Sequence, residues 1–346
     1  MSTSHITSSA VTIDTIELTG RIATIIETAR KRVKTVIDTE MVRAYWEIGR
    51  EIVVDEQKGE KRAGYGKALL ARVSNELTAQ YGEGFDARNL RFMRQFYQTY
   101  QNWNAVRSEL SWTHFRLIMR HDDSQKRSFY EIESVNSNWS TRELERQMNS
   151  MLYERLSLSR DVDDVKTLAR EGQILATPSD MVKDPYVLEF LGLPQDGRLL
   201  EKDLENALIS KLQQFLLELG KGFSFVARQR RITLDGRHFF IDLIFYNYIL
   251  KCFVLIDLKT GELTHQDIGQ MQMYVNYFTR ELVNEGDSPP IGILLCDTKS
   301  EAVVRYTLPE GSTQIFASRY KLYLPTEEEL AAELVRERQA IELEHG

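Results

Sequence analysis

Residues 239–245, FFIDLIF, and residues 253–259, FVLIDLK, are two apolar runs of strand length, each with an aspartate inside it. A buried carboxylate without a partner is costly or takes up a proton, so the fold must have a reason to keep both acids. Because side chains alternate along a strand, Asp257 and Lys259 share one face, and a hairpin would bring Asp242 beside them. Two carboxylates and an ammonium in one place can hold a divalent metal against a phosphate. The pattern therefore predicts a metal-dependent nuclease.

The composition fits a globular chain of two domains, with 346 residues, 42% hydrophobic and 27% charged. A net charge of -7 gives no general attraction to nucleic acid, so binding would need local basic clusters or a metal. Cys252 and Cys296 lie in apolar runs, which indicates reduced core thiols and a cytoplasmic protein. The polar start of the chain does not resemble a secretory signal, and no stretch is apolar enough to span a membrane.

Apolar spacing divides the chain into two parts. Helical periodicity over residues 16–160 predicts an all-α bundle, with Asp86 as a helix cap and Ser140 and Glu143 as a capping box. Residues 161–198 contain three prolines and read as a connecting segment whose apolar part, residues 186–191, docks on one of the domains. We expect a second domain over residues 199–325 and a charged helix over residues 326–346.

The second domain changes period to that of strands. A helix over residues 201–219 precedes three strand-like segments at 223–234, 238–246 and 252–259, with Asp235-Gly236 as a hairpin turn. A helix over 266–285 and strands at 291–296 and 314–322 follow. This αβββαβ order predicts a mixed sheet flanked by helices, a restriction-endonuclease-like core after an all-α domain.

Several motifs in this order resemble those of the PD-(D/E)xK nuclease superfamily. Over residues 16–325 the chain is similar to the YhcG-like family, which joins a helical N-terminal domain to such a nuclease. The matching stretches are DLENAL (203–208), FLLELGKGF (215–223), Arg228-Gln229, IDLIFY (241–246), IDLKTG (256–261) and GQMQMY (269–274).

The resemblance implies that Asp242 and Asp257 bind Mg²⁺, which Mn²⁺ could replace, and that Lys259 positions the attacking water. Physical chemistry gives the same roles, because two neighbouring carboxylates repel each other unless a cation lies between them, and hard oxygen ligands suit these ions. Family members often have Glu where this chain has Asp257. The structural alternative is a salt bridge between Asp257 and Lys259, with Asp242 capping a turn.

Four further residues are candidates for the site. Glu205 matches the third acid that the superfamily often supplies from the preceding helix, or it is an ordinary exposed glutamate. Gln270 and Tyr274 lie one helical turn apart and match a Gln-x-x-x-Tyr element whose Gln lies near the metal and whose Tyr lies near DNA. Gln229 could face the site from the first strand and contact nucleic acid, or it could support the strand ladder.

The helical half has a second candidate for nucleic-acid binding. A helix, a glycine-containing turn and a helix carrying Arg88, Arg91 and Arg94 resemble a helix-turn-helix in outline, and these arginines could meet phosphates. The alternative is a solvated basic face of a bundle helix. No Walker-type phosphate loop is present, so we expect no nucleotide cofactor.

Together these patterns predict a Mg²⁺-dependent nuclease that hydrolyses DNA through an activated water, as a dimer, in defence against foreign DNA or in DNA processing. One alternative is a nucleic-acid-binding or partner-binding protein that keeps the fold without catalysis. Another is a nuclease that acts on RNA. The helical half could bind a protein partner.

Overall fold

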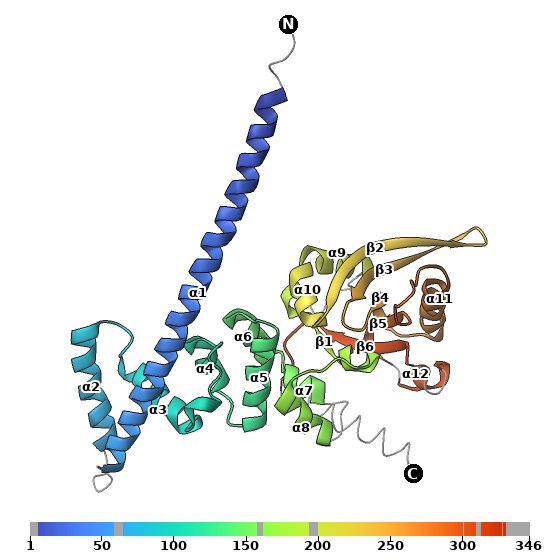
Figure 1. The fold of residues 1–346 in the computed structure, drawn as a ribbon. Helices are drawn as coiled ribbons and strands as arrows, with labels where there is room; N and C mark the ends of the chain where they lie inside the picture. The colour runs from blue at the N-terminus through green and yellow to red at the C-terminus, as the bar shows by residue number, and fades with distance from the viewer. Residues whose placement is uncertain are drawn as a thin grey trace. The chain divides into compact units, whose positions relative to one another are not determined.

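A computed structural model describes residues 6–58, 65–157, 162–193, 200–299, 301–308, 313–326 and 328–329. The chain forms two compact units, Met1–Arg127 and Ser128–Gly346. Within the described ranges, none of the helices combines the length and the apolar character needed to cross a membrane. The helices up to the connecting segment are α1 (Ile6–Lys58), α2 (Tyr65–Tyr81), α3 (Ala87–Thr99), η1 (Trp103–Ala105), α4 (Trp112–Ile118), α5 (Ser124–Asn136), α6 (Thr141–Asn149), α7 (Leu152–Ser157) and α8 (Val162–Glu171) (Figure 1).

The first unit is built around the packing of α3 against α1. Asp86 caps α3 as predicted, with its side chain accepting from the backbone N–H groups of Arg88 and Asn89. Leu90, Met93 and Phe96 form the buried face of α3. The two helices approach closely because position 49 on α1 is glycine, where a Cβ would lie 2.0 Å from the Met93 carbonyl oxygen.

Helices α6 and α7 belong to the second unit, whereas the sequence analysis drew its domain boundary at residue 160. The reason is a buried ionic network. Arg155 and Glu218 are both fully buried and lie 2.5 Å apart, and the Arg146 Nη1 atom lies 3.1 Å from the Glu218 carboxylate. These charges are paired inside the second unit, so the helices that carry the arginines fold with the sheet.

The second unit contains a six-stranded mixed sheet in the order β1-β6-β5-β4-β3-β2. The strands β2, β3 and β4 are antiparallel neighbours, whereas β5, β6 and β1 continue the sheet in parallel. The segment expected to dock on one domain supplies β1, which pairs with β6 as an edge strand. The bounds are β1 (Tyr186–Val187), β2 (Phe223–Leu234), β3 (Arg237–Asn247), β4 (Cys252–Glu262), β5 (Ile291–Thr298) and β6 (Ile315–Lys321).

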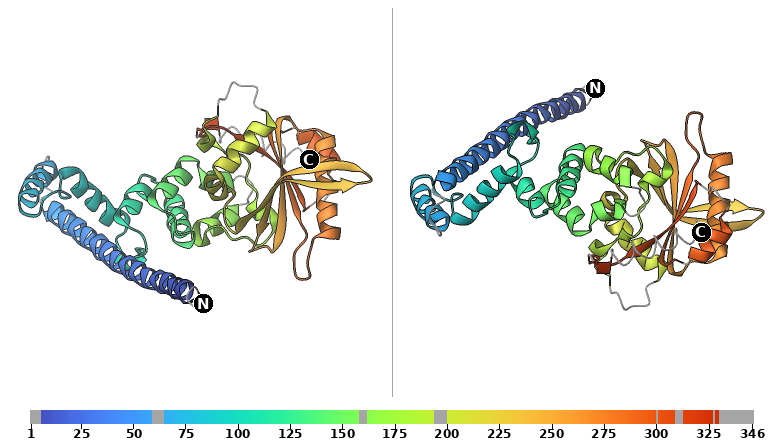
Figure 2. Two further views of the ribbon diagram at one scale, coloured as in Figure 1. Left: turned by 90° about the horizontal axis from the view of Figure 1, so that it is seen from above. Right: turned by 90° about the horizontal axis from the view of Figure 1, so that it is seen from below.

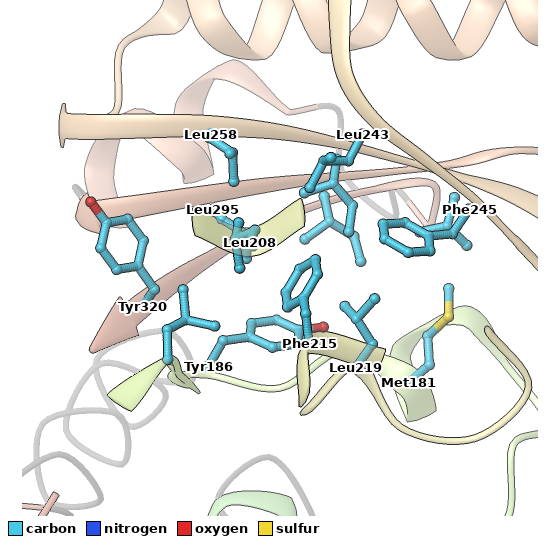
Figure 3. Close-up of a cluster of buried hydrophobic side chains, with 14 of the residues drawn as sticks. Met181, Tyr186, Leu208, Phe215, Leu219, Leu243, Phe245, Leu258, Leu295 and Tyr320 are labelled. Atoms are coloured by element: carbon cyan, nitrogen blue, oxygen red, sulfur yellow. The ribbon is translucent and has the colours of Figure 1, made fainter. Parts of the chain in front are cut away.

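Helices cover both faces of the sheet. One core contains Leu208 and Phe215, and the close-up in Figure 3 shows such side chains packed against strand residues such as Leu243 and Phe245. The second core lies between the sheet and α11 and includes Met271. The remaining helices are η2 (Pro178–Met181), η3 (Glu189–Leu191), α9 (Glu201–Ser210), α10 (Leu212–Leu219), α11 (His265–Glu281) and α12 (Glu301–Thr307).

The predicted helix over residues 201–219 is two helices. Lys211, with φ -117° and ψ 31°, leaves the helical conformation and separates α9 from α10. Buried leucines lie on both helices, including Leu208 and Leu219, so the break lets each segment pack on the same core. The charged helix predicted over residues 326–346 lies almost entirely outside the described residues.

Candidate active site

The two aspartates lie where β3 and β4 separate. The last paired residues of this ladder are Leu243 and Ile256, so Asp242 and Asp257 occupy the next position on each strand. The backbone N–H of Leu258 donates to the Asp242 Oδ2 atom at 2.8 Å. The Asp242 side chain therefore takes the place of a backbone acceptor at the end of the ladder, which fixes it beside β4.

Asp257 is buried, with 2% of its surface exposed, and its Oδ2 atom accepts no well-aligned hydrogen bond. Burial and the neighbouring charge of Asp242 raise the pKa of Asp257 to about 7, against the opposing effect of Lys259. The carboxylate is thus held in a place where its negative charge is unfavourable. A cation bound between the two aspartates would remove that penalty.

Lys259 brings a positive charge to the same face of β4. Its Nζ atom lies 3.0 Å from Asp257, 3.7 Å from Asp267 and 3.8 Å from Glu201. Burial by itself would lower the pKa of Lys259, but the charge and hydrogen bond of Asp257 together with the charges of Glu201 and Asp267 outweigh it, and the pKa is raised. The ammonium is therefore positively charged and positioned by carboxylates from three elements.

Gln229 connects β2 to two carboxylates. Its Nε2 atom donates to Glu205 at 2.8 Å and to Asp242 at 2.9 Å. The residue has a φ of 45°, an uncommon conformation for a residue with a side chain, and it follows a bulge in β2 after Phe225. Such local strain in a strand is typical of a functional site.

Glu205 lies in the predicted place, on the helix that precedes the sheet. It is 6% exposed, so the reading as an ordinary exposed glutamate is wrong. Burial and the charge of Asp242 raise the pKa of Glu205, whereas the hydrogen bond from Gln229 opposes this. Glu205 and Asp242 are brought to one point by the amide that they share.

Gln270 and Tyr274 lie on α11 and contact each other. The Gln270 amide donates to the Tyr274 hydroxyl, which in turn donates to the Phe240 carbonyl oxygen at 2.8 Å. Tyr274 is fully buried, and burial raises its pKa to about 12. Its hydroxyl thus holds the backbone of β3, and the position of this residue near DNA stays a prediction.

The three arginines of α3 differ in their surroundings. Arg94 is half-buried and forms a 3.1 Å salt bridge with Glu56. Arg88 and Arg91 are exposed. The predicted basic face therefore has two exposed arginines that could meet phosphates, Arg88 and Arg91. Arg94 already neutralises Glu56 within the first unit.

The sequence analysis missed two acids beside Lys259. Asp267 accepts from the backbone N–H of Thr264 at 2.9 Å, in a capping box that opens α11. The Thr-x-x-Asp spacing at residues 264–267 was a usable signal, since it starts this helix next to the end of β4. Glu201, in the first turn of α9, gave no such signal.

The donor atoms of the site are carboxylate oxygens, which suit a divalent metal such as Mg²⁺. Within the described ranges, no three His, Cys, Asp or Glu side chains form a ready-made metal cluster. The fit rests on the pair Asp242 and Asp257, since these two carboxylates lie together and Lys259, 3.0 Å from the Oδ2 atom of Asp257, is the only cation paired with them among the described residues. Glu205 is attached to this pair through Gln229 and could join directly or through a water.

We expect the stability of the metal-free protein to fall as pH rises from about 4 to about 7. In this window folded Asp257, with its raised pKa, keeps a proton that the unfolded chain has lost, so the linkage favours the folded state at the lower pH. Thermal unfolding in EDTA should give Asp257→Asn and wild type similar Tm values at pH 5. At pH 8 the variant should be the more stable. A difference independent of pH would contradict the assignment.

Models of two families match the chain. The YhcG PDDEXK nuclease domain matches residues 179–335, and the DUF1016 N-terminal domain matches residues 21–155. A protein of Escherichia coli (strain K12) named "Putative nuclease YhcG" is 36% identical over 350 residues, which span 92% of this chain and 93% of that protein.

Two solved structures are similar to a smaller part of the chain. A repair endonuclease from Pyrococcus abyssi is 20% identical with a TM-score of 0.26, covering 38% of this chain and 50% of its own. The EndoMS-dsDNA2 complex is 16% identical with a TM-score of 0.27, covering 39% and 50%. The chain thus spans about half of each solved chain.

Proposed function

The chain belongs to the YhcG family of PDDEXK nucleases, and from this premise we propose that it hydrolyses DNA phosphodiester bonds at a divalent-metal site. Asp242 and Asp257 would hold the metal, with Glu205 as a further ligand. The observation that carries the proposal is the buried Asp257 carboxylate, 3.0 Å from Lys259 and beside a second aspartate. Mg²⁺ suits these oxygen donors, and Mn²⁺ could replace it.

Each residue of the site has a separate task in this proposal. A bound divalent ion supplies Lewis-acid stabilisation of the phosphoryl oxygens and lowers the pKa of a coordinated water. The Lys259 ammonium donates a hydrogen bond to the attacking water or to a charged phosphoryl oxygen. Gln229 keeps Glu205 and Asp242 oriented, while Gln270 and Tyr274 fix β3. Water displaces the leaving oxygen at phosphorus, and no covalent intermediate with the enzyme forms.

The nature of the polymer is a proposal as well. The solved EndoMS complex contains double-stranded DNA as the ligand of that protein. RNA is the second candidate substrate, since the proposed site would act on the phosphodiester group, which both polymers share. A role in defence against foreign DNA or in DNA processing would follow from activity on DNA.

The test is a cleavage panel of supercoiled plasmid, linear duplex, single strand, four-way junction and structured RNA, each with Mg²⁺, Mn²⁺ or EDTA. Metal-dependent cutting of DNA supports the proposal, and cutting of RNA alone would replace it by the second candidate. If no polymer is cut but DNA is bound, a binding protein that retains the fold becomes the better description.

Dimerisation is a further part of the proposal. Helix α1 exposes apolar side chains at helical spacing, among them Ile25 at 67% and Val36 at 62%. A second copy, or another protein partner, would cover them. We expect light scattering to give the mass of two chains, and Ile25→Glu with Val36→Glu to give that of one. A monomeric wild type would contradict the dimer.

A cytoplasmic location is also proposed. It is supported by Cys252 and Cys296, which are buried free thiols. Burial raises the pKa of both thiols, so neither is a reactive thiolate.

A further inference from the structure

The strands β2 and β3 continue past the rest of the sheet as a two-stranded arm, which we define as residues 228–241. Pairing of β3 with β4 ends at Leu243, whereas pairing of β2 with β3 continues to Leu234 and Arg237. The turn at Asp235 and Gly236 has φ values of 47° and 77°, as expected for Asp-Gly in a two-residue hairpin. Figure 1 and both views of Figure 2 show this arm extending beyond the other strands.

The two faces of the arm differ. Ile232 and Ile241 are buried in the core that contains α11, and Phe239 packs against it. The alternate residues lie on the opposite face, where Arg231 pairs with Phe240 across the strands. All of the side chains on that face are exposed, namely Arg231, Thr233, His238 and Phe240.

The arm is strongly basic although the whole chain has a net charge of -7. It has a single acidic residue, Asp235, at the turn. Within the part of the chain that the structure describes, no arginine of the arm forms a salt bridge, although the charge of Arg228 acts on Glu205. The arm carries four arginines, all of them exposed, namely Arg228, Arg230, Arg231 and Arg237. Closely spaced guanidinium groups that form no salt bridges can bind a polyanion such as a nucleic acid.

Phe240 is an aromatic ring within this basic surface. It is 46% exposed, and its carbonyl oxygen is held by the Tyr274 hydroxyl. It lies two positions before Asp242, a distance of about 7 Å along a strand. An exposed ring flanked by arginine is the combination that binds a base by stacking, since the ring contacts the base face while the cations contact phosphates.

A paired duplex does not offer its base faces to a protein surface, because they are stacked on one another. Its groove edges and phosphates are accessible instead. A stacking ring close to the carboxylates is therefore useful only where a nucleotide near the cut is unpaired. Arg237 alternates onto the other face but is exposed beside the turn, five residues from Asp242, so the arginines of the arm extend about 17 Å from the site, over several nucleotides.

We propose that the exposed face of the arm binds a single-stranded stretch of DNA next to the scissile phosphate. Phe240 stacks on an unpaired base, while Arg231 on the same face and Arg237 at the tip of the arm contact phosphates. The inference rests on the proposed nuclease function and narrows its substrate to DNA with unpaired nucleotides at the cut, such as a flap, a bubble or a junction.

The first test measures binding in EDTA, so that no cleavage is needed. Two fluorescently labelled DNAs of one sequence are compared, a full duplex and a duplex with an unpaired central tract that contains 2-aminopurine. We expect Phe240→Ala to weaken binding of the unpaired DNA by about tenfold and of the duplex by less than about twofold. Phe240→Trp should retain binding and quench 2-aminopurine, whereas Phe240→Leu should do neither.

Tyr306→Ala is the matched control for Phe240→Ala, since Tyr306 is an 83% exposed aromatic residue on α12.

The second test compares the salt dependence of binding. Arg231→Ala with Arg237→Ala should lower the slope of log K against log salt by about 1.4, at about 0.7 for each single-strand phosphate contact. Arg142→Ala with Arg280→Ala, also exposed arginines of the second unit, should leave the slope unchanged.

Equal effects of Phe240→Ala on paired and unpaired DNA, or none on either, would overturn the proposal, as would rescue by Phe240→Leu. Thermal unfolding of each variant shows whether weaker DNA binding comes from the removed side chain or from an unfolded protein. An enzyme that binds unpaired DNA through Phe240 but never cuts would contradict the nuclease function and leave the arm assignment standing. Cleavage of DNA that Phe240→Ala leaves unchanged, with no selective loss of binding to unpaired DNA, would support the nuclease function and contradict the assignment of the arm.

Discussion

Asp257→Asn and Lys259→Ala are each expected to lower kcat/KM for DNA cleavage by about a thousandfold. The asparagine keeps the shape of the side chain but removes the charge that a metal needs, and the alanine removes the ammonium that lies 3.0 Å from Asp257. A single preorganised charge aimed at the reacting group is worth about a hundredfold to a thousandfold in rate. Initial rates on the best substrate of the panel in Mg²⁺ measure the effect.

The control for this pair is Asp297→Asn. Asp297 is an exposed acid near the end of β5, so its replacement changes the net charge by as much as Asp257→Asn does without touching the carboxylate pair. It should stay within about twofold of wild type. Retention of more than a tenth of the wild-type rate by either Asp257→Asn or Lys259→Ala would contradict the site. DNA binding in EDTA should show that both variants remain folded.

Glu218→Gln is expected to destabilise the second unit by about 3–5 kcal/mol, because it leaves buried cations without their counter-charge. Burial alone would raise the pKa of Glu218, but Arg155, Lys183 and Arg146 outweigh it and hold the pKa at about 2. The Glu218 carboxylate also accepts from the backbone N–H of Val187 at 2.9 Å, where β1 joins the sheet.

Thermal unfolding should show this loss as a decrease in Tm of about 10 °C for a unit of this size. Glu171→Gln is the comparison, since Glu171 forms an exposed salt bridge with Arg170 at 3.2 Å. An exposed pair contributes about 0–1 kcal/mol, so its loss should barely change the Tm. If Glu218→Gln has an equally small effect, the buried network does not hold α6 and α7 to the sheet.

The strands of the core were predictable because their sequence signals are local. Period-two burial put Asp257 and Lys259 on one face, and Asp235-Gly236 fixed the hairpin turn, so β2, β3 and β4 agree with their predicted bounds to within about three residues. The capping box at Ser140 and Glu143 is likewise confirmed, with both of its hydrogen bonds present. Such features depend on residues a few positions apart.

Features that depend on distant residues were not predictable. The two-residue strand β1 exists because β6, more than a hundred residues later, offers it an edge. The grouping of α6 and α7 with the sheet depends on Glu218, and nothing near Arg155 in the sequence indicates that partner. The left-handed conformation of Gln229 likewise has no local signal, since the residue type does not favour it.

Tyr274 is different, because a signal was present. The apolar residues of α11 recur at Ile268, Met271, Val275 and Phe278, and Tyr274 falls on the same stripe. That spacing places the ring in the core, with only its hydroxyl available to β3. The motif match by itself gave no sign that this side chain is buried, whereas the helical periodicity does.

The hairpin construction of the arm limits how its length can vary. In an antiparallel pair, hydrogen-bonded and non-hydrogen-bonded positions alternate, and the two-residue turn at Asp235-Gly236 must close on one kind of pair. Residues can therefore be added or removed only as two successive cross-strand pairs if the turn and both faces are to be kept. The reach of the arm then changes in steps of about 7 Å. Relatives with longer or shorter arms should differ by multiples of four residues between Gln229 and Asp242.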